Sequence, residues 1–98
     1  MWEFRVKDGC EKQFEQIYGP NGDWVQLFKN GKGYLRTELH RDISAANRYI
    51  TIDYWISKEA CEEFRKRWKK EFQALDEQSE SLAEEEKPLG SFISMGQS

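Results

Sequence analysis

The chain has 98 residues, a net charge of −3 and 34% charged residues, which fits one small domain in water. Its negative charge gives no general attraction to nucleic acid or to anionic membranes, and no apolar run approaches the roughly 20 residues of a membrane span. We therefore expect a single domain over residues 1–96, located in the cytoplasm, with neither nucleic acid nor a membrane as a partner.

Sequence motifs for metals and cofactors are not visible. Cys10 and Cys61 form no CxxC pair, and a single histidine does not provide a set of zinc ligands. No flavin motif appears either. We expect no metal site and no bound cofactor.

The first third of the chain predicts a strand followed by two short helices. Residues 2–7, WEFRVK, alternate apolar and charged side chains, as a half-buried strand does. Apolar residues then recur at helical spacing over residues 10–18, and GPNG at 19–22 interrupts that helix. Asp23 is predicted to cap a second short helix, which ends at NGKG, residues 30–33.

Two strands and a long helix follow. The strands are predicted over GYLRTELHRD, residues 33–42, and RYITIDYWI, residues 48–56. Ser57 can cap a helix whose apolar residues recur every three, four or seven positions as far as residue 82. The acidic segment EEEKP should end the helical region, and LGSFIS, residues 89–94, is the expected last strand.

This order of elements predicts an α+β fold of the ferredoxin-like βαββαβ type. In that fold a four-stranded antiparallel sheet carries its helices on one face. The opposite face would be open in a single chain.

The third predicted strand has two different sides, because alternate residues of a strand point in opposite directions. One side is apolar and consists of Ile50, Ile52, Tyr54 and Ile56. The other is mixed and consists of Tyr49, Thr51, Asp53 and Trp55. A strand that is apolar on its open side favours a homodimer packed sheet to sheet; the alternative is a twisted monomer whose loops cover that side.

Several segments together resemble the antibiotic biosynthesis monooxygenase-like domain of the dimeric α/β-barrel superfamily. They are WEFRV, YGPNGDWVQLF, GYLRTEL, YITIDYWIS leading into EACEEF, and LGSF. The most specific of these features is Trp55, two residues before Ser57 at the start of the long helix. The resemblance implies a ligand pocket in each subunit between sheet and helices, lined by Trp55, with the two sheets facing each other across a homodimer.

Family positions that carry function are only partly matched. Members that oxidise polyketide quinol precursors have an Asn and a Tyr where this chain has Thr51 and Cys61. Haem-degrading members have an Asn, a Trp and a His where this chain has Trp2, Phe64 and Ala74. The missing histidine speaks against haem degradation. Thr51, Cys61, Trp2 and Phe64 remain predicted substrate-binding positions.

The candidate catalytic residue is Asp53, which lies on the same strand side as Trp55. A carboxylate beside aromatic surface loses hydration, which raises its pKa and suits it to act as a base. The alternative is a structural acid, held by an ion pair or by a hydrogen bond to Thr37. Trp2, Trp24 and Trp55 could form a stacking wall for a flat ligand, or could simply pack in the core.

Two functions fit these observations. The first is an oxygenase that needs neither metal nor flavin and oxidises a flat aromatic or quinol-type small molecule with O₂. The second is a dimeric small-molecule-binding or stress-response protein with the same pocket and no turnover.

Overall fold

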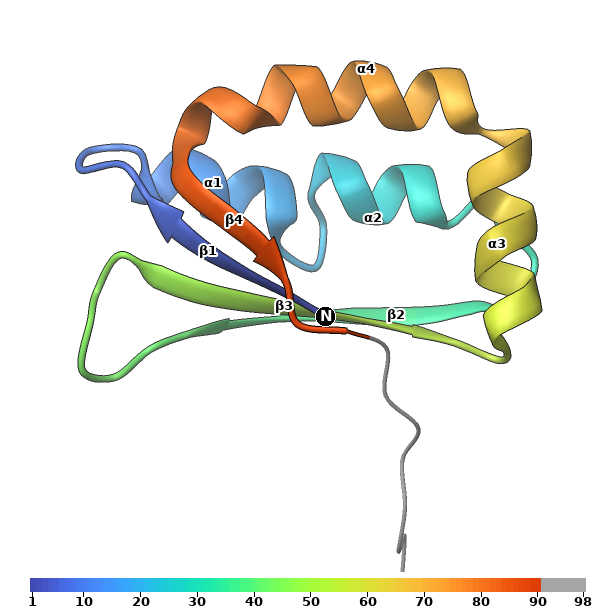
Figure 1. Ribbon diagram of the computed structural model, residues 1–98, viewed down its shortest axis with the longest axis horizontal. Helices are drawn as coiled ribbons and strands as arrows, with labels where there is room; N and C mark the ends of the chain where they lie inside the picture. Colours follow the sequence, from blue (N-terminus) through green and yellow to red (C-terminus); the bar gives the residue numbers. More distant parts are fainter. Residues whose placement is uncertain (91–98) are drawn as a thin grey trace, which may run out of the picture.

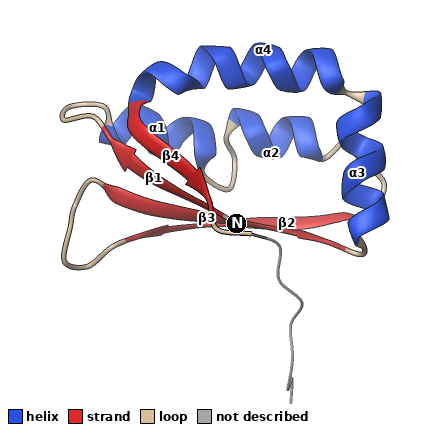
Figure 2. Ribbon diagram, viewed as in Figure 1, coloured by secondary structure: helices blue, strands red, loops and turns tan. Residues whose placement is uncertain are grey.

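The computed structural model describes residues 1–90 and arranges four antiparallel strands in one sheet, in the order β2-β3-β1-β4 (Figure 1). The strands are β1 (Trp2–Val6), β2 (Tyr34–Arg41), β3 (Arg48–Trp55) and β4 (Ala83–Pro88). The helices are α1 (Glu11–Tyr18), α2 (Asp23–Phe28), α3 (Lys58–Arg67), α4 (Lys69–Ser79) and the short 3-10 helix η1 (Glu80–Leu82). All of them lie on one side of the sheet (Figure 2), so the predicted ferredoxin-like fold is confirmed.

The two short helices in the first third of the chain are also confirmed, but the predicted cap is wrong. Gly22, not Asp23, precedes α2, and no side chain caps this helix. A Cβ atom at Gly22 would lie 2.2 Å from the carbonyl oxygen of Ile17, so the turn folds back too closely on α1 for any residue but glycine. Asp23 instead occupies the first turn of α2, where its charge suits the helix dipole.

The predicted single helix over residues 58–82 is wrong, because the chain bends at Trp68. This residue separates α3 from α4 and has non-helical angles, φ −109° and ψ 29°. Phe64 in α3 packs on Trp55 at the end of β3 and on Phe28 of α2, whereas Phe72 in α4 packs edge-on against Trp24 of α2. The apolar spacing continues through the bend, so periodicity could not show that the two halves contact different side chains.

The last strand begins earlier than predicted, in the acidic segment that was expected to end the helical region. β4 pairs with β1 and places Glu86 opposite Phe4. Because β4 is an edge strand with exposed side chains, it accommodates charges and lacks the alternating pattern that marks a half-buried strand. Of the strand predicted over residues 89–94, residues 89 and 90 are not in a strand, and residues 91–94 lie outside the described part of the chain.

Ser57 caps α3 as predicted, since its hydroxyl oxygen accepts a hydrogen bond from the backbone N–H of Ala60, with 3.1 Å between the two heavy atoms. We expect Ser57→Ala to lower the free energy of unfolding by about 1 kcal/mol, measured by urea denaturation. Ser57→Asp should retain most of the stability, because aspartate also caps. An equal loss in both variants would show that the cap is not the cause.

The core between sheet and helices is mostly aromatic. Phe14 is fully buried in α1, stacks on Tyr18 with 4.3 Å between ring centroids, and contacts Phe4 of β1 and Tyr49 of β3. The buried apolar residues of this core are Phe4, Val6, Phe14, Tyr18, Trp24, Phe28, Tyr49, Phe64 and Leu82. Large flat side chains leave irregular gaps where they meet, and one such gap holds the candidate site.

The open face of the sheet carries Ile50, Ile52 and Tyr54, which are half-buried within the single chain. Long charged side chains supply part of this cover: the Arg36 guanidinium lies 3.9 Å from the centre of the Tyr54 ring, and Arg36 also pairs with Glu38. Charged residues can cover apolar surface in this way through their hydrocarbon stems. The sheet-to-sheet homodimer stays a prediction.

Candidate functional site

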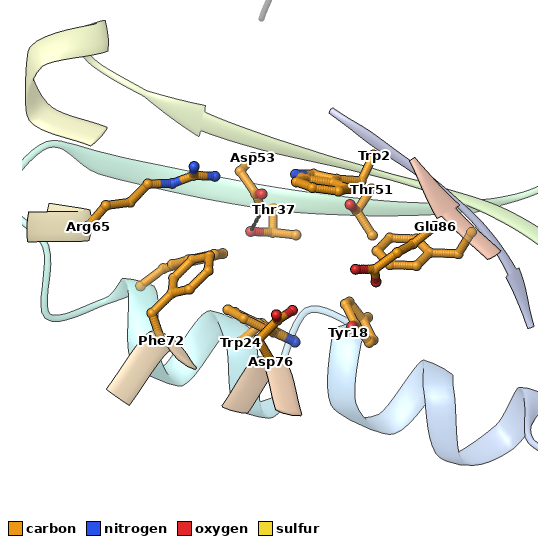
Figure 3. A pocket seen from close by; sticks show the side chains of 12 residues that line it. Trp2, Tyr18, Trp24, Thr37, Thr51, Asp53, Arg65, Phe72, Asp76 and Glu86 are labelled. Carbon is orange, nitrogen blue, oxygen red and sulfur yellow. Dashed lines mark hydrogen bonds between the residues drawn. The ribbon is translucent and has the colours of Figure 1, made fainter. Parts of the chain in front are cut away.

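A cavity of about 260 Å³ lies between the helix-facing side of the sheet and the helices (Figure 3). It is near the lower end of the roughly 300–1,000 Å³ typical of small-molecule sites. All four strands and all four α-helices contribute to its lining, which consists of Trp2, Phe4, Tyr18, Trp24, Phe28, Thr37, Thr51, Asp53, Arg65, Phe72, Asp76 and Glu86. Half of these residues are aromatic, so the walls suit a flat apolar ligand.

Asp53 enters this cavity from β3 on the same side as Thr51, as strand alternation requires. Thr37, directly opposite on β2, donates a hydrogen bond of 2.7 Å from its Oγ1 to Asp53 Oδ1. Burial raises the pKa of the Asp53 carboxyl, while the Thr37 hydrogen bond and then the N-terminal ammonium and Arg65 oppose that shift. The sequence offered a raised pKa of Asp53 and a hydrogen bond from Thr37 as alternatives. In the structure both occur together.

The opposite end of the cavity is formed by α1, α4 and β4 and holds Tyr18, Asp76 and Glu86 (Figure 3). Burial raises the pKa of Tyr18 to about 12, with a further contribution from the charge of Glu86. The pKa of Glu86 is raised by burial and then by the charges of Asp76 and Glu80. This end is acidic, so it disfavours ligands that carry a negative charge there.

Trp24 forms part of the cavity floor and is 6% exposed. Its indole N–H is buried and has no hydrogen-bond partner among residues 1–90. An unpaired buried donor costs about 1–3 kcal/mol, which a bound water or ligand oxygen would offset.

Three side chains lie between the cavity and the molecular surface. Arg65, Phe72 and Asp76 line both the cavity and a shallower outer groove between α3 and α4. The Arg65 guanidinium lies 5.2 Å from the centre of the Phe72 ring, a cation–π contact, and extends toward Asp53 in Figure 3. The bend at Trp68 creates this groove, because it turns α3 away from the axis of α4.

The structure brings four of the seven predicted site residues together and leaves three apart. Trp2, Trp24, Thr51 and Asp53 line the cavity. The other three, Trp55, Cys61 and Phe64, do not. Trp55 packs on Phe28, Tyr34 and Phe64, with centroid distances of 5.9, 5.3 and 5.3 Å respectively. Burial raises the pKa of the half-buried Cys61 thiol. The roles assigned to all seven stay predictions.

Sequence reasoning did not single out the helix side chains of the lining, Arg65, Phe72 and Asp76. Their spacing carries a weak signal, since Phe72 and Asp76 are four residues apart on α4 and share one helix face. Arg65 lies in a run of basic residues, Arg65 to Arg67, at the end of α3. The bend at Trp68 brings it to the cavity mouth, and that bend has no clear sequence signature.

A family model described as antibiotic biosynthesis monooxygenase matches residues 1–78. The chain belongs to this family. The match spans the strands β1, β2 and β3 that carry Trp2, Thr37 and Asp53, and most of α4. A comparison with curated proteins gave no match.

Solved structures of other proteins have the same fold. SnoaB, a cofactor-independent oxygenase from Streptomyces nogalater, superimposes with a TM-score of 0.72 at 18% identity, over 98% of this chain and 93% of that chain. A Bordetella bronchiseptica protein assigned to the antibiotic biosynthesis monooxygenase family gives a TM-score of 0.70 at 22% identity, over 92% of this chain and 93% of that chain. At such identities the likeness establishes the fold and not the reaction.

None of the helices within residues 1–90 is long and apolar enough to cross a membrane. The same residues contain no cluster of three or more histidine, cysteine or acidic side chains placed to hold a metal ion.

Proposed function

We propose that this family member oxidises a small, flat phenol or quinol with O₂, without metal or flavin, and that Asp53 is the base. The single observation that carries the proposal is the Asp53 carboxyl, which faces an aromatic-lined cavity of about 260 Å³ and has its pKa raised by burial. A base is most effective when its pKa approaches the working pH. The cofactor-independent oxygenase SnoaB, which shares the fold, supports the same class of chemistry.

The proposed reaction balances without an external reductant. Asp53 takes the proton of a ring hydroxyl, and the resulting phenolate gives one electron to O₂. The aryloxyl radical and superoxide combine at a ring carbon that carries hydrogen, and the peroxide formed there takes up a proton. Loss of the ring C–H proton and cleavage of the O–O bond release water and leave a quinone carbonyl. The ligand supplies all four electrons that reduce O₂.

The residues around Asp53 supply binding and exclusion of water. Trp2, Trp24 and Phe72 are placed to hold a flat ring, and the side chains at the mouth limit the access of solvent. Among residues 1–90, Arg65 is the only cationic side chain in the lining, and its charge favours a phenolate formed beside Asp53. We also propose that the protein is a cytoplasmic homodimer and that its domain extends to residue 96.

The second candidate is a small-molecule binder without turnover. The observation that favours it is the presence of Thr51 and Cys61 where quinol-oxidising members carry Asn and Tyr. Such a binder would use the same cavity and would not need Asp53 to lose its proton.

Oxygen uptake distinguishes the two candidates. The protein should consume O₂ with a panel of naphthols and hydroquinones, in the presence of a chelator and with no added flavin, and form one quinone per O₂. Calorimetry on the same compounds reports binding independently of turnover. Binding without oxygen uptake would overturn the oxygenase and support the binder.

A further inference from the structure

Two hydroxyl groups extend from Asp53 toward the edge of the sheet. Thr37 Oγ1 donates to Asp53 Oδ1 over 2.7 Å, and Tyr34 Oη lies 2.7 Å from the same Thr37 oxygen. A threonine hydroxyl has one hydrogen, and here it is directed to Asp53. Tyr34 is therefore the donor in the second bond. The three groups form a continuous chain in which each oxygen is in hydrogen-bond contact with the next.

A β-bulge places both hydroxyls on the helix side of the sheet. Tyr34 and Thr37 are three residues apart, and in a regular strand they would point to opposite faces. Tyr34 pairs with Trp55 and Arg36 with Tyr54, so Leu35 is an extra residue in β2. The inserted residue restores the alignment, and Leu35 itself is 54% exposed.

The hydroxyl chain leads out of the cavity. Asp53 and Thr37 line the cavity, whereas Tyr34 does not. Tyr34 lies on β2, which is an edge strand, and its side chain is half-buried. One end of the chain therefore faces the proposed ligand, and the other reaches the border of the sheet.

We propose that Thr37 and Tyr34 are positioning residues that exchange the proton of Asp53 with solvent; this inference rests on the proposed role of Asp53 as base. Once Asp53 is protonated, both hydroxyls rotate, so that Asp53 donates to Thr37 and Thr37 donates to Tyr34, the reverse of the directions described above. The O–H bond of protonated Asp53 then breaks as its proton passes to Thr37 Oγ1. The hydrogen that Thr37 carried passes to Tyr34 Oη, and that of Tyr34 passes to water. One proton leaves the cavity, Asp53 becomes a carboxylate again, and both hydroxyls stay neutral. The reverse sequence returns a proton when the peroxide needs one.

The charged and titratable groups around Asp53, Thr37 and Tyr34 keep both hydroxyls neutral, as the proton transfer requires. Burial, and then the charge of Asp53, raise the pKa of Tyr34, so this phenol stays protonated at neutral pH. The groups that face Asp53 are Arg65 and Cys61 of α3, the N-terminal ammonium before β1, and Tyr34 of β2. Across the cavity are Tyr18 of α1, Asp76 of α4 and Glu86 of β4.

The test is a pH jump on a complex with the chromogenic probe 4-nitrophenol, without O₂ chemistry. The complex is formed below the pKa of the probe and mixed into alkaline buffer, and the rate at which bound phenolate appears is followed by absorbance. Tyr34→Phe and Thr37→Val should each slow this rate by at least about 10-fold, since proton transfer through placed groups is worth 10²–10⁴-fold. Thr37→Ser should restore it, because the hydroxyl returns.

A control variant and an NMR titration distinguish a proton relay through Thr37 and Tyr34 from a purely structural role of these residues. Tyr54→Phe removes a tyrosine hydroxyl on the open face and should leave the rate unchanged. In an NMR titration of the Asp53 carboxyl, Thr37→Val should raise the pKa, because it removes a hydrogen bond that favours the carboxylate, whereas Tyr34→Phe should leave that pKa close to its wild-type value.

The outcomes distinguish a failure of Asp53 as the base from a failure of the relay. If Asp53→Asn ionises the bound probe as fast as the wild type, Asp53 is not the base and the proposed function fails. If Asp53→Asn is slow but Tyr34→Phe and Thr37→Val are as fast as the wild type, Asp53 is the base and the relay is wrong. Slow ionisation in Thr37→Ser as well would also count against the relay.

Discussion

Replacing Asp53 by Asn is expected to lower the rate of oxygen uptake by about 10²–10⁴-fold, the usual effect of removing a general base. Asn is nearly isosteric with Asp and can still accept the Thr37 hydrogen bond, so the cavity and the affinity for a phenol should be retained. The loss should therefore appear in kcat rather than in binding. Oxygen-electrode rates and calorimetry on the same preparation provide both measurements.

The control for this variant is Asp8→Asn, which makes the same chemical change in the exposed turn after β1. It should have wild-type activity. Equal activity in Asp53→Asn would show that the reaction does not pass through this carboxyl, and loss of the folded circular dichroism spectrum would show that Asp53 is structural.

Asp53→Asn should lower the activity but should not lower the resistance to urea at neutral pH. The pKa of Asp53 is raised in the folded state, so the native protein binds this proton more tightly than the unfolded chain does. The contribution of Asp53 to stability is therefore fully present at acidic pH and is lost as pH rises through the raised pKa. Asp53→Asn lacks that loss, and we expect its midpoint in urea at neutral pH to equal or exceed that of the wild type.

Trp55→Ala is expected to cost about 3 kcal/mol of unfolding free energy, the lower end of the range for deleting a buried tryptophan, because the side chain is half-exposed. Its ring contacts Phe28, Tyr34 and Phe64, and these contacts would be lost together. Since Trp55 does not line the cavity, affinity for 1-naphthol should change little in the fraction that remains folded.

Trp2→Ala is the matched variant, since Trp2 is also a half-buried tryptophan on a strand but lines the cavity. Within residues 1–90 it stacks on Phe4, with 6.5 Å between ring centroids. We expect a smaller loss of stability than in Trp55→Ala and a larger loss of naphthol affinity. The reverse pattern, measured by urea melts and calorimetry, would place the ligand beside Trp55, as the family resemblance implied.

The sheet could be predicted because its inner strands alternate. Residue parity grouped Thr51 and Asp53 with Trp55 on one side of β3, and the family resemblance assigned that side to the pocket. Thr37 was named as a hydrogen-bond partner of Asp53 in the structural alternative. The grouping needs only the two-residue period of a strand. The homodimer, the ligand and the residue roles stay predictions.

The elements that sequence reasoning missed are those set by tertiary packing. At the bend at Trp68, Phe64 packs on Trp55 of β3 while Phe72 packs on Trp24 of α2, although their spacing fits one continuous helix. β4 is exposed and acidic, so its side chains lack the alternating pattern of a half-buried strand. It is a strand because its backbone pairs with β1. The position of Tyr34 beside Thr37 does not follow from the sequence, because strict alternation places residues three apart on opposite faces.

Tyr34 and Thr37 share one face of the sheet because Leu35 is inserted between them, whatever its side chain. A family member that keeps both hydroxyl residues but has one residue fewer between them would present its tyrosine to the opposite face of the sheet. Substitution of Leu35 by most residues would leave the arrangement intact, whereas its deletion would abolish it. Among homologous sequences, a one-residue gap at this position is therefore a better marker of divergence in proton handling than any nearby substitution.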